Sequence, residues 1–191
     1  MKKLFALALF CFTALSANAA IVSADFRTEA DLPNAGSAGP LVHERLNAAV
    51  GSGLELDAGD YVANPSGWGG GRLWLDLDAS TNVLTLLSQD EWDFQTLLVT
   101  VTNISGSTIT GIELLSDTLT FPGLVPQLSF TANSISIFYS NLPGDFDFTG
   151  GSATFALLTG VAEVPEPQSV LLFGAGFALI GLARRRKGKQ A

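Results

Sequence analysis

The sequence predicts a mainly β protein whose central part, residues 20–160, folds as an antiparallel β-sandwich of jelly-roll or immunoglobulin-like kind. Short segments in this part alternate between apolar and polar residues, and turn-forming clusters separate them roughly every ten residues. Two further apolar stretches, one at each end of the chain, have the features of targeting segments. We therefore expect an N-terminal signal peptide, a sandwich domain and a single C-terminal transmembrane helix.

The N-terminal segment has the three parts of a secretory signal. Two lysines follow the initial methionine, residues 4–15 form an apolar run, and small residues stand at Ala17 and Ala19. This order predicts a signal peptide over residues 1–19, which signal peptidase removes by cutting between Ala19 and Ala20. Cys11, the only cysteine of the chain, lies inside the apolar run, so the mature protein has no disulfide, no thiolate nucleophile and no cysteine metal ligand.

The strands of the central part are predicted from residue periodicity. Residues 72–78 alternate strictly, with Leu73, Leu75 and Leu77 on one face of a half-buried strand. Residues 96–102 are rich in β-branched side chains and read as a more central strand. The other predicted strands cover residues 21–26, 82–87, 108–115, 127–131, 134–139, 145–149 and 153–158.

Turn chemistry predicts how some of these segments are connected. Residues 103–107, with the sequence NISGS, can close a hairpin between the strands on either side of them. Residues 64–71 form a long glycine-rich loop. Residues 41–50, LVHERLNAAV, are the one stretch with helical character, and we expect a short peripheral helix there.

The C-terminal part changes composition after residue 160. Residues 161–167 form a short, proline-stiffened linker, because proline fixes its own φ and keeps the preceding residue out of the helical region. Residues 168–183 carry no charge and predict a transmembrane helix of about 24 Å, which is short for a hydrocarbon core of about 30 Å. Residues 184–191 form a basic tail that stays cytoplasmic, so the sandwich domain faces outward.

These C-terminal residues resemble a PEP-CTERM sorting signal. Pro165, Glu166 and Pro167 match its name-giving motif, and the glycine-interrupted apolar run of residues 169–183 matches its helix. The membrane stop consists of Arg184, Arg185, Arg186 and Lys187. The resemblance identifies the chain as an exported protein with a PEP-CTERM sorting domain and a substrate of exosortase.

The resemblance also implies a location and a setting. Exosortase, an integral-membrane enzyme, cuts near the motif, so the helix over residues 168–183 is a temporary anchor in the inner membrane of a Gram-negative bacterium. The freed protein then reaches the cell surface or the extracellular matrix, in bacteria that make exopolysaccharide and often live in biofilms. Exosortase and signal peptidase are therefore the expected processing partners.

The charge of the chain is strongly segregated. The net charge is −8, but the part between the signal peptide and the basic tail holds only three arginines against all eighteen acidic residues, a net charge of −15. Such a domain repels nucleic acid and anionic surfaces, so we expect no nucleic-acid partner. Without lysine, this part also has no Walker A motif and no Schiff-base lysine.

The sequence offers no enzyme motif, no cofactor site and no metal site that we would assign. His43 is the only histidine, which excludes a multi-histidine metal centre, and no Gly-x-Ser-x-Gly accompanies it, so we expect an ordinary surface histidine. Acidic pairs could bind calcium through carboxylate oxygens, although the EF-hand spacing is absent. We expect a protein that is not an enzyme.

Two functions from different classes stay open for the central domain. One is a non-enzymatic surface or matrix protein associated with exopolysaccharide. The other is a carbohydrate-binding module, with or without calcium, that holds exopolysaccharide. The residues that would bind sugar in this second case are Trp68, Trp74, Asp76 and Asp78, an arrangement of aromatic rings near carboxylates, although tryptophan in a sandwich more often serves packing.

Overall fold

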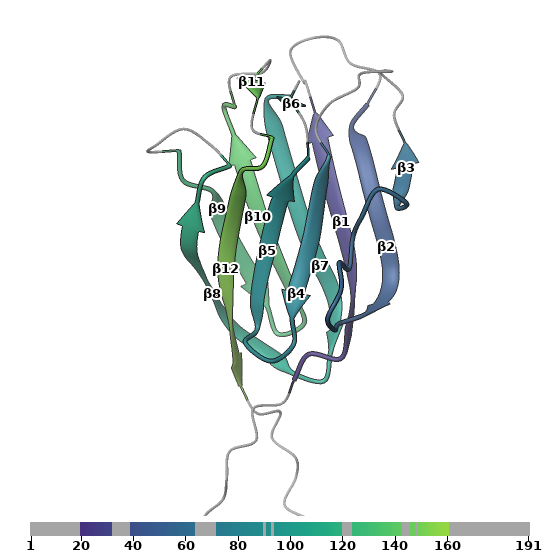
Figure 1. Cartoon of the computed structure of the whole chain (residues 1–191). Helices are drawn as coiled ribbons and strands as arrows, with labels where there is room; N and C mark the ends of the chain where they lie inside the picture. Colours follow the sequence, from purple (N-terminus) through teal and green to yellow (C-terminus); the bar gives the residue numbers. More distant parts are fainter. Residues whose placement is uncertain are drawn as a thin grey trace, which may run out of the picture. The chain divides into compact units, whose positions relative to one another are not determined.

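The computed structural model describes residues 20–31, 39–63, 72–89, 91–92, 94–119, 124–142, 146–147 and 149–160. These residues form twelve strands, and none of them is helical (Figure 1). The strands are β1 (Ser23–Asp31), β2 (Leu41–Ala49), β3 (Tyr61–Ala63), β4 (Leu73–Asp78), β5 (Val83–Ser88), β6 (Glu91–Trp92), β7 (Thr96–Ser105), β8 (Thr108–Asp117), β9 (Gln127–Thr131), β10 (Ser134–Ser140), β11 (Phe146–Asp147) and β12 (Ser152–Gly160).

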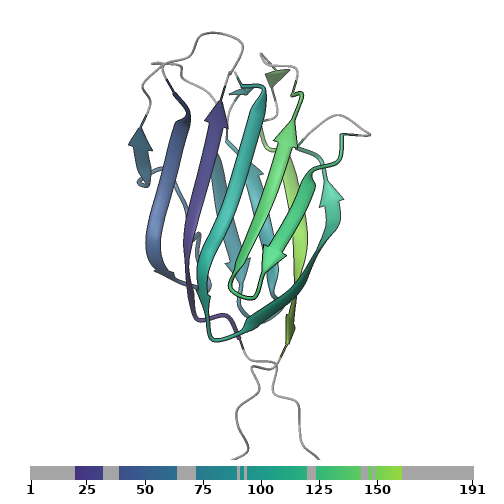
Figure 2. The same ribbon diagram turned by 180° about the vertical axis from the view of Figure 1, so that it is seen from behind.

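The strands form two main sheets that face each other as in a β-sandwich (Figures 1 and 2). The six-stranded sheet has the order β3-β2-β1-β7-β10-β9, and the four-stranded sheet has the order β4-β5-β12-β8. A separate pair joins β11 and β6. All strand pairs between them are antiparallel. The predicted mainly β, antiparallel fold is confirmed.

The core lies between the two sheets and is built from every second residue of the long strands. Leu73, Leu75 and Leu77 of β4 are fully buried, as their alternation predicts. The other sheet supplies Phe26 from β1 and the inward-facing residues of β7 and β10. Where a strand buries one face only, most of its polar residues remain on the outer surface of the sandwich.

Strand β7 is central, as its β-branched composition predicts. It is hydrogen-bonded to β1 on one side and to β10 on the other, with Val99 placed opposite both Thr28 and Ile137. Val99 and Val101 are fully buried. With both edges of β7 occupied, no further strand can pair with it.

The hairpin predicted at residues 103–107 is wrong. β7 lies in the six-stranded sheet and β8 in the four-stranded sheet, so the turn carries the chain from one layer to the other. Asn103 and Gly106 have positive φ angles, 51° and 87°, and a Cβ atom on Gly106 would overlap the carbonyl oxygen of Ala20. The residues are typical of a turn, as predicted, but local sequence does not determine which sheet each flanking strand joins. β7 pairs with β1 and β10, and β8 pairs with β12.

The helix predicted at residues 41–50 is also wrong, since this segment is strand β2. It pairs with β1 over nearly its whole length, with Glu44 opposite Arg27 and Val42 opposite Glu29. Cross-strand pairing and burial of Leu41 and Val42 override the weak helical pattern. β1 continues five residues beyond the predicted strand at residues 21–26, and β2, β3 and β6 are strands where none was predicted.

The two ends of the described domain lie at the same end of the sandwich (Figure 1). The backbone N–H of Val22 donates to the carbonyl of Ser105 at 3.0 Å, and Gly160 is the register partner of Thr108. Both ends of the described domain therefore lie beside the turn between β7 and β8.

The predicted targeting segments are not among the described residues. The signal peptide (1–19), the linker (161–167), the transmembrane helix (168–183) and the basic tail (184–191) all lie outside them. Within the described ranges, no helix is long and apolar enough to cross a membrane.

Candidate functional site

The outer face of β4 presents three of the four residues that the sequence singles out for sugar binding. Trp74, Asp76 and Asp78 alternate with buried leucines, so all three point away from the core. Trp74 and Asp76 are half-buried, whereas Asp78 is exposed. Trp68 lies outside the described residues.

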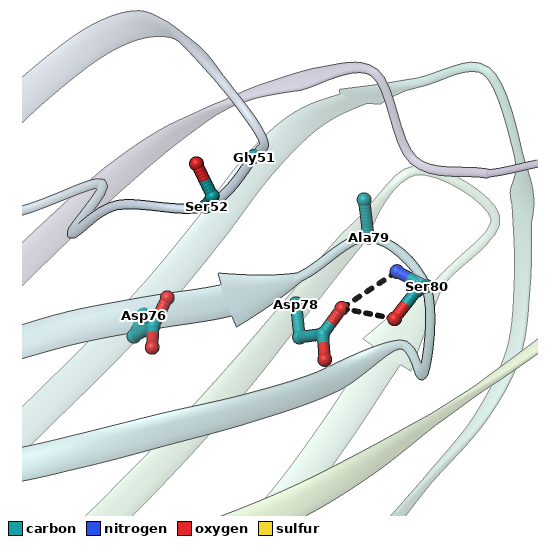
Figure 3. A pocket seen from close by; sticks show the side chains of 6 residues that line it. All are labelled: Gly51, Ser52, Asp76, Asp78, Ala79 and Ser80. Carbon is teal, nitrogen blue, oxygen red and sulfur yellow. Dashed lines mark hydrogen bonds between the residues drawn. The ribbon is translucent and has the colours of Figure 1, made fainter.

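A shallow hollow of about 450 Å³ lies beside the end of β4 (Figure 3). Its walls come from two places in the chain, the end of β4 with the turn that follows it, and the segment after β2. The lining residues are Gly51, Ser52, Asp76, Asp78, Ala79 and Ser80. Trp74 is not one of these residues, so the aromatic ring and the hollow are neighbouring features and not one built pocket.

Asp78 stabilises the turn between β4 and β5. Its Oδ1 accepts hydrogen bonds from the Ser80 hydroxyl at 2.6 Å and from the Ser80 backbone N–H at 2.7 Å (Figure 3). These hydrogen bonds, led by that of the Ser80 hydroxyl, lower the pKa of the Asp78 carboxyl below its ordinary value. Asp78 therefore stays ionised and orders the turn as an Asx motif.

The Asp76 carboxylate makes fewer hydrogen bonds with the described residues than the Asp78 carboxylate does. In the part of the chain that the structure describes, its carboxylate makes no hydrogen bond and no ion pair. It lies close enough to Glu55 to raise the pKa of that carboxyl. Asp76 can therefore accept hydrogen bonds from a ligand without losing bonds that stabilise a turn, whereas Asp78 cannot.

Glu55 is a buried acidic residue that the sequence did not reveal. It is 2% exposed, and its Oε2 accepts the backbone N–H of Leu77 at 2.6 Å while its Oε1 accepts that of Gly51 at 3.1 Å. Burial is the main cause that raises the pKa of the Glu55 carboxyl, with Asp76 adding to it. In sequence, Glu55 alternates with Leu54 and Leu56 like any solvent-facing strand residue, so no signal identifies it.

Arg45 stabilises the segment between β2 and β3. Its Nε contacts Asp60 at 2.7 Å, and its Nη2 contacts Asp57 at 3.1 Å. A third bond runs from Nη1 to the carbonyl of Leu54 at 3.2 Å. The Gly59 backbone N–H and the Arg45 guanidinium lower the pKa of the Asp57 carboxyl. This acidic loop is thus ordered by donors from its own chain.

Among the residues that the structure describes, the carboxylates in and near the hollow do not form a preassembled calcium site. Among the described residues, no group of three or more His, Cys, Asp or Glu side chains could hold a metal ion. Asp78 and Glu55 already use a carboxylate oxygen each to accept a backbone N–H group.

His43 is not the surface histidine that the sequence suggested. It is 2% exposed and lies opposite Thr28, itself 1% exposed, so the two face the interior between the sheets. The β2–β1 pairing that replaced the predicted helix accounts for this difference, because it places His43 on the inner side of the sheet.

The sorting residues themselves lie outside the described residues. This applies to Pro165, Glu166 and Pro167, to the membrane stop Arg184, Arg185, Arg186 and Lys187, and to Ala19 of the expected signal cleavage. Ala20, the other side of that bond, is described, and its side chain is exposed.

Comparison with family models finds a PEP-CTERM protein-sorting motif at residues 163–187. The chain therefore carries an export and membrane-anchored sorting signal that implies processing by exosortase. No curated protein and no solved structure matches the chain. The match covers the C-terminal cassette that the sequence pattern identified, and the sandwich domain has no such match.

Proposed function

We propose that this chain is a non-enzymatic bacterial protein of the cell surface or extracellular matrix, delivered in two processing steps. The single observation that supports this most is the PEP-CTERM motif at residues 163–187, which ends in a basic cluster close to the C-terminus. Paired with a secretory signal at residues 1–19, it gives one topology, with the acidic domain outside and the arginines inside.

The short anchor fits a temporary role. A helix over residues 168–183 reaches about 24 Å, so it crosses a hydrocarbon core of about 30 Å only with snorkelling side chains or local thinning of the bilayer. A marginal span is sufficient for a segment that exosortase separates from the domain. The released domain then belongs to the exopolysaccharide matrix of a Gram-negative bacterium.

The chemistry of the described residues supports a role without catalysis. His43 is buried between the sheets, and Asp78, Glu55 and Asp57 are used by backbone N–H groups. General acid–base work needs a group within reach of a substrate, and these groups are instead committed to turns and loop closure. The high negative charge favours a soluble, self-repelling domain.

Intact mass spectrometry of the protein from the culture medium tests this proposal. The expected mature form begins at Ala20 and lacks residues 184–191, and deletion of exosortase should leave the longer form in the membrane fraction. An extracellular protein that still carries Arg184 to Ala191 would refute the sorting mechanism. A form that still begins at Met1 would refute the N-terminal step alone.

Carbohydrate binding is the second candidate, favoured by the outer face of β4. Trp74 offers a half-buried ring, and Asp76, two residues along the same face, offers a carboxylate free of hydrogen bonds to the described residues. Aromatic rings stack on the apolar faces of sugars while carboxylates accept their hydroxyl groups. Because the domain is strongly acidic, a neutral exopolysaccharide suits this face better than an anionic one.

Calorimetry of the secreted protein with the host's neutral exopolysaccharide, with and without calcium, separates the two candidates. Binding should disappear in Trp74→Ala and weaken in Asp76→Asn. Phe138→Ala is the matched control, because Phe138 is a half-buried aromatic on the outer face of the other sheet. No heat of binding with the wild-type protein would leave the structural role alone.

A further inference from the structure

Strand β9 forms one edge of the six-stranded sheet, and among the described residues it pairs only with β10 (Figure 2). Four of its five residues are exposed, and Leu128 is half-buried. Phe130 is 48% exposed, and Val125, just before the strand, is 71% exposed. Apolar side chains therefore reach solvent along a strand that has one unpaired side.

The register with β10 determines which backbone groups of β9 point away from the sheet. Thr131 and Ser134 flank a two-residue turn, so they form a hydrogen-bonded pair. Hydrogen-bonded pairs alternate with other pairs along an antiparallel ladder, so Ser129 also bonds to β10. The N–H and C=O groups of Leu128 and Phe130 therefore point to the free side of β9.

The free edge is limited on both sides of these two residues. Pro126 precedes the strand and has no N–H to donate. In the turn that follows the strand, the carbonyl of Ala132 accepts the N–H of Ile109 at 2.9 Å. Within the described ranges, Leu128 and Phe130 thus supply the open donors and acceptors of this edge.

This edge is also free of charged residues. Residues 118–144 contain no charged side chain, and neither does β7, which pairs with β10 on its other side. By contrast, β8 carries Glu113 and Asp117, the short β3 directly follows Asp60, and loop residues bond to the β4 edge. Residues 20–183 contain three arginines and eighteen acidic residues, a net charge of −15, so two copies meet the least repulsion at β9.

We propose that β9 pairs with β9 of a second copy of this chain, antiparallel and across a twofold axis, so that two six-stranded sheets become one continuous sheet. In this arrangement Ser129 lies opposite the partner's Ser129, and Leu128 lies opposite the partner's Phe130. Each of the two Leu128–Phe130 pairs exchanges two backbone hydrogen bonds, because both residues direct their N–H and C=O groups to the free edge.

The adjacent registers use fewer of these groups. Placing Leu128 opposite itself would bring Phe130 opposite Pro126, which cannot donate. Placing Phe130 opposite itself would bring Leu128 opposite Ala132, whose carbonyl already accepts a hydrogen bond. The register centred on Ser129 therefore matches the edge to itself.

The side chains fit the same register. Leu128 and Phe130 lie opposite the buried Ile137 and Ile135 of β10, so their side chains are on the core side of the sheet. Pairing brings each Phe130 ring beside the partner's Leu128 and removes apolar surface from water. The inference goes beyond the proposed delivery to the cell surface, since it concerns how copies of the domain associate and depends on neither processing step.

Sedimentation of the exported protein over a concentration series tests the proposal. The protein is purified from the culture medium or, with detergent, from the membrane fraction. Pairing of two five-residue strands buries little surface, so we expect a reversible dimer with a dissociation constant on the order of 100 µM. Wild-type protein that stays monomeric up to about 1 mM would overturn the inference.

Ser129→Lys is the main variant, because it places two ammonium groups opposite each other at the axis. The dissociation constant should rise at least about tenfold, although the substitution lowers the net negative charge of each copy. Ser136→Lys is the matched control. Ser136 is the register partner of Ser129 on β10, so the two new charges of that dimer lie three strand spacings apart, roughly 14 Å, and the dissociation constant should stay within about twofold of wild type.

A mixture of Ser129→Lys with Ser129→Asp gives the decisive measurement. Each variant alone should dimerise more weakly than wild type, whereas the mixture brings opposite charges together and should associate at least as tightly as wild type. Ser129 is exposed, so unchanged melting temperatures should confirm that both variants keep the fold. A dimer that persists in Ser129→Lys, or that the mixture does not restore, would place the contact elsewhere and refute the pairing of β9.

Discussion

The two edge strands of the four-stranded sheet, β4 and β8, differ in what bonds to their outer edges. At the β4 edge, Leu56 forms a bridge with Leu75, and Leu75 N–H donates to the Leu56 carbonyl at 3.1 Å. The buried carboxylate of Glu55 then accepts the next outward-facing donor, the N–H of Leu77. A short loop segment and one side chain thus take the place of a fifth strand.

The β8 edge has less cover among the described residues. Near its start, the N–H of Ile109 donates to the carbonyl of Ala132, between β9 and β10, at 2.9 Å. β8 is ten residues long and pairs only with β12. It is tied to the opposite sheet by Asp117, whose Oδ2 accepts the hydroxyl of the fully buried Tyr139 at 2.9 Å. Leu115, 56% exposed, lies on its outer side.

The difference shows that a carboxylate can act as part of a sheet or as a tie between sheets. Glu55 substitutes for backbone carbonyls along an edge, whereas Asp117 joins β8 to β10 across the core. Loop residues bond to the β4 edge at Leu75 and Leu77, whereas the described bonds to the outer edge of β8 are limited to Ile109. Four substitutions test this comparison.

The largest effect is expected from Leu56→Ala at the closed edge. Leu56 is fully buried, and its removal leaves a cavity beneath the loop that covers β4. Unfolding in urea should show a loss of about 2–5 kcal/mol in the free energy of unfolding. Leu115→Ala on β8 is the control, with a change within about 0.5 kcal/mol, because Leu115 is exposed. Equal losses at the two positions would contradict the difference between the edges.

Tyr139→Phe removes the hydrogen bond that joins β10 to β8. The Asp117 carboxylate loses a hydrogen bond in a half-buried position, so the free energy of unfolding should fall by about 1–2 kcal/mol. Burial and the neighbouring Asp117 raise the pKa of the Tyr139 hydroxyl, which therefore remains a donor at neutral pH. Hydrogen exchange at β8 amides should accelerate more than at β4 amides, and the reverse order would refute the tie.

Glu55→Gln tests the buried carboxylate through its pH dependence. Because the pKa of Glu55 is raised in the folded protein, its stabilising contribution is complete below the unfolded pKa, about 4.3, and is lost as the pH rises through the folded pKa. Glutamine is always neutral and can still accept the Leu77 N–H. The variant should therefore gain stability relative to wild type between pH 4 and pH 7. Urea unfolding at both pH values measures this, and a relative loss would contradict it.

The smallest effect is expected from Asp78→Asn, with the opposite sign. The pKa of Asp78 is lowered in the folded protein, so its contribution is present above the unfolded pKa, about 3.9, and is lost as the pH falls through the folded pKa. Asparagine keeps the turn but cannot titrate. Wild type should be slightly more stable at pH 7, and the two melting temperatures should converge toward pH 2. A constant gap would show that the charge of Asp78 is irrelevant.

Local patterns predicted the strands best where one face is buried along the whole segment. The predicted strand at residues 134–139 lies within β10, which buries every second residue, and the alternation of β4 places its three leucines in the core. The segment that became β2 has no clear alternation, since Leu41, Val42 and His43 are buried one after another. Its conformation comes from pairing with β1, which local periodicity does not contain.

The candidate site was predicted only in part, for the same physical reason. Period-two alternation placed Trp74, Asp76 and Asp78 on one outer face, and the structure agrees. It gave no indication that Glu55 is buried or that Asp78 orders a turn, because both depend on donors supplied by folded backbone. The hollow between Gly51 and Asp78 likewise needs two segments that meet only in the folded chain.

By itself, the sequence determined the sorting cassette at residues 163–187, the segregation of charge and the face that most strands bury. Each of these properties depends on contiguous residues. The order of the residues and the period of their polarity are therefore enough to recognise them. The tertiary structure alone decided that β7 and β8 lie in different sheets, that one sheet edge is closed, and that Ala20 packs against Gly106. Such features join residues that are far apart in the chain; Ser23 and Ser105, for example, are 82 positions apart. In addition, a strand can pair only along an edge that no other strand already occupies.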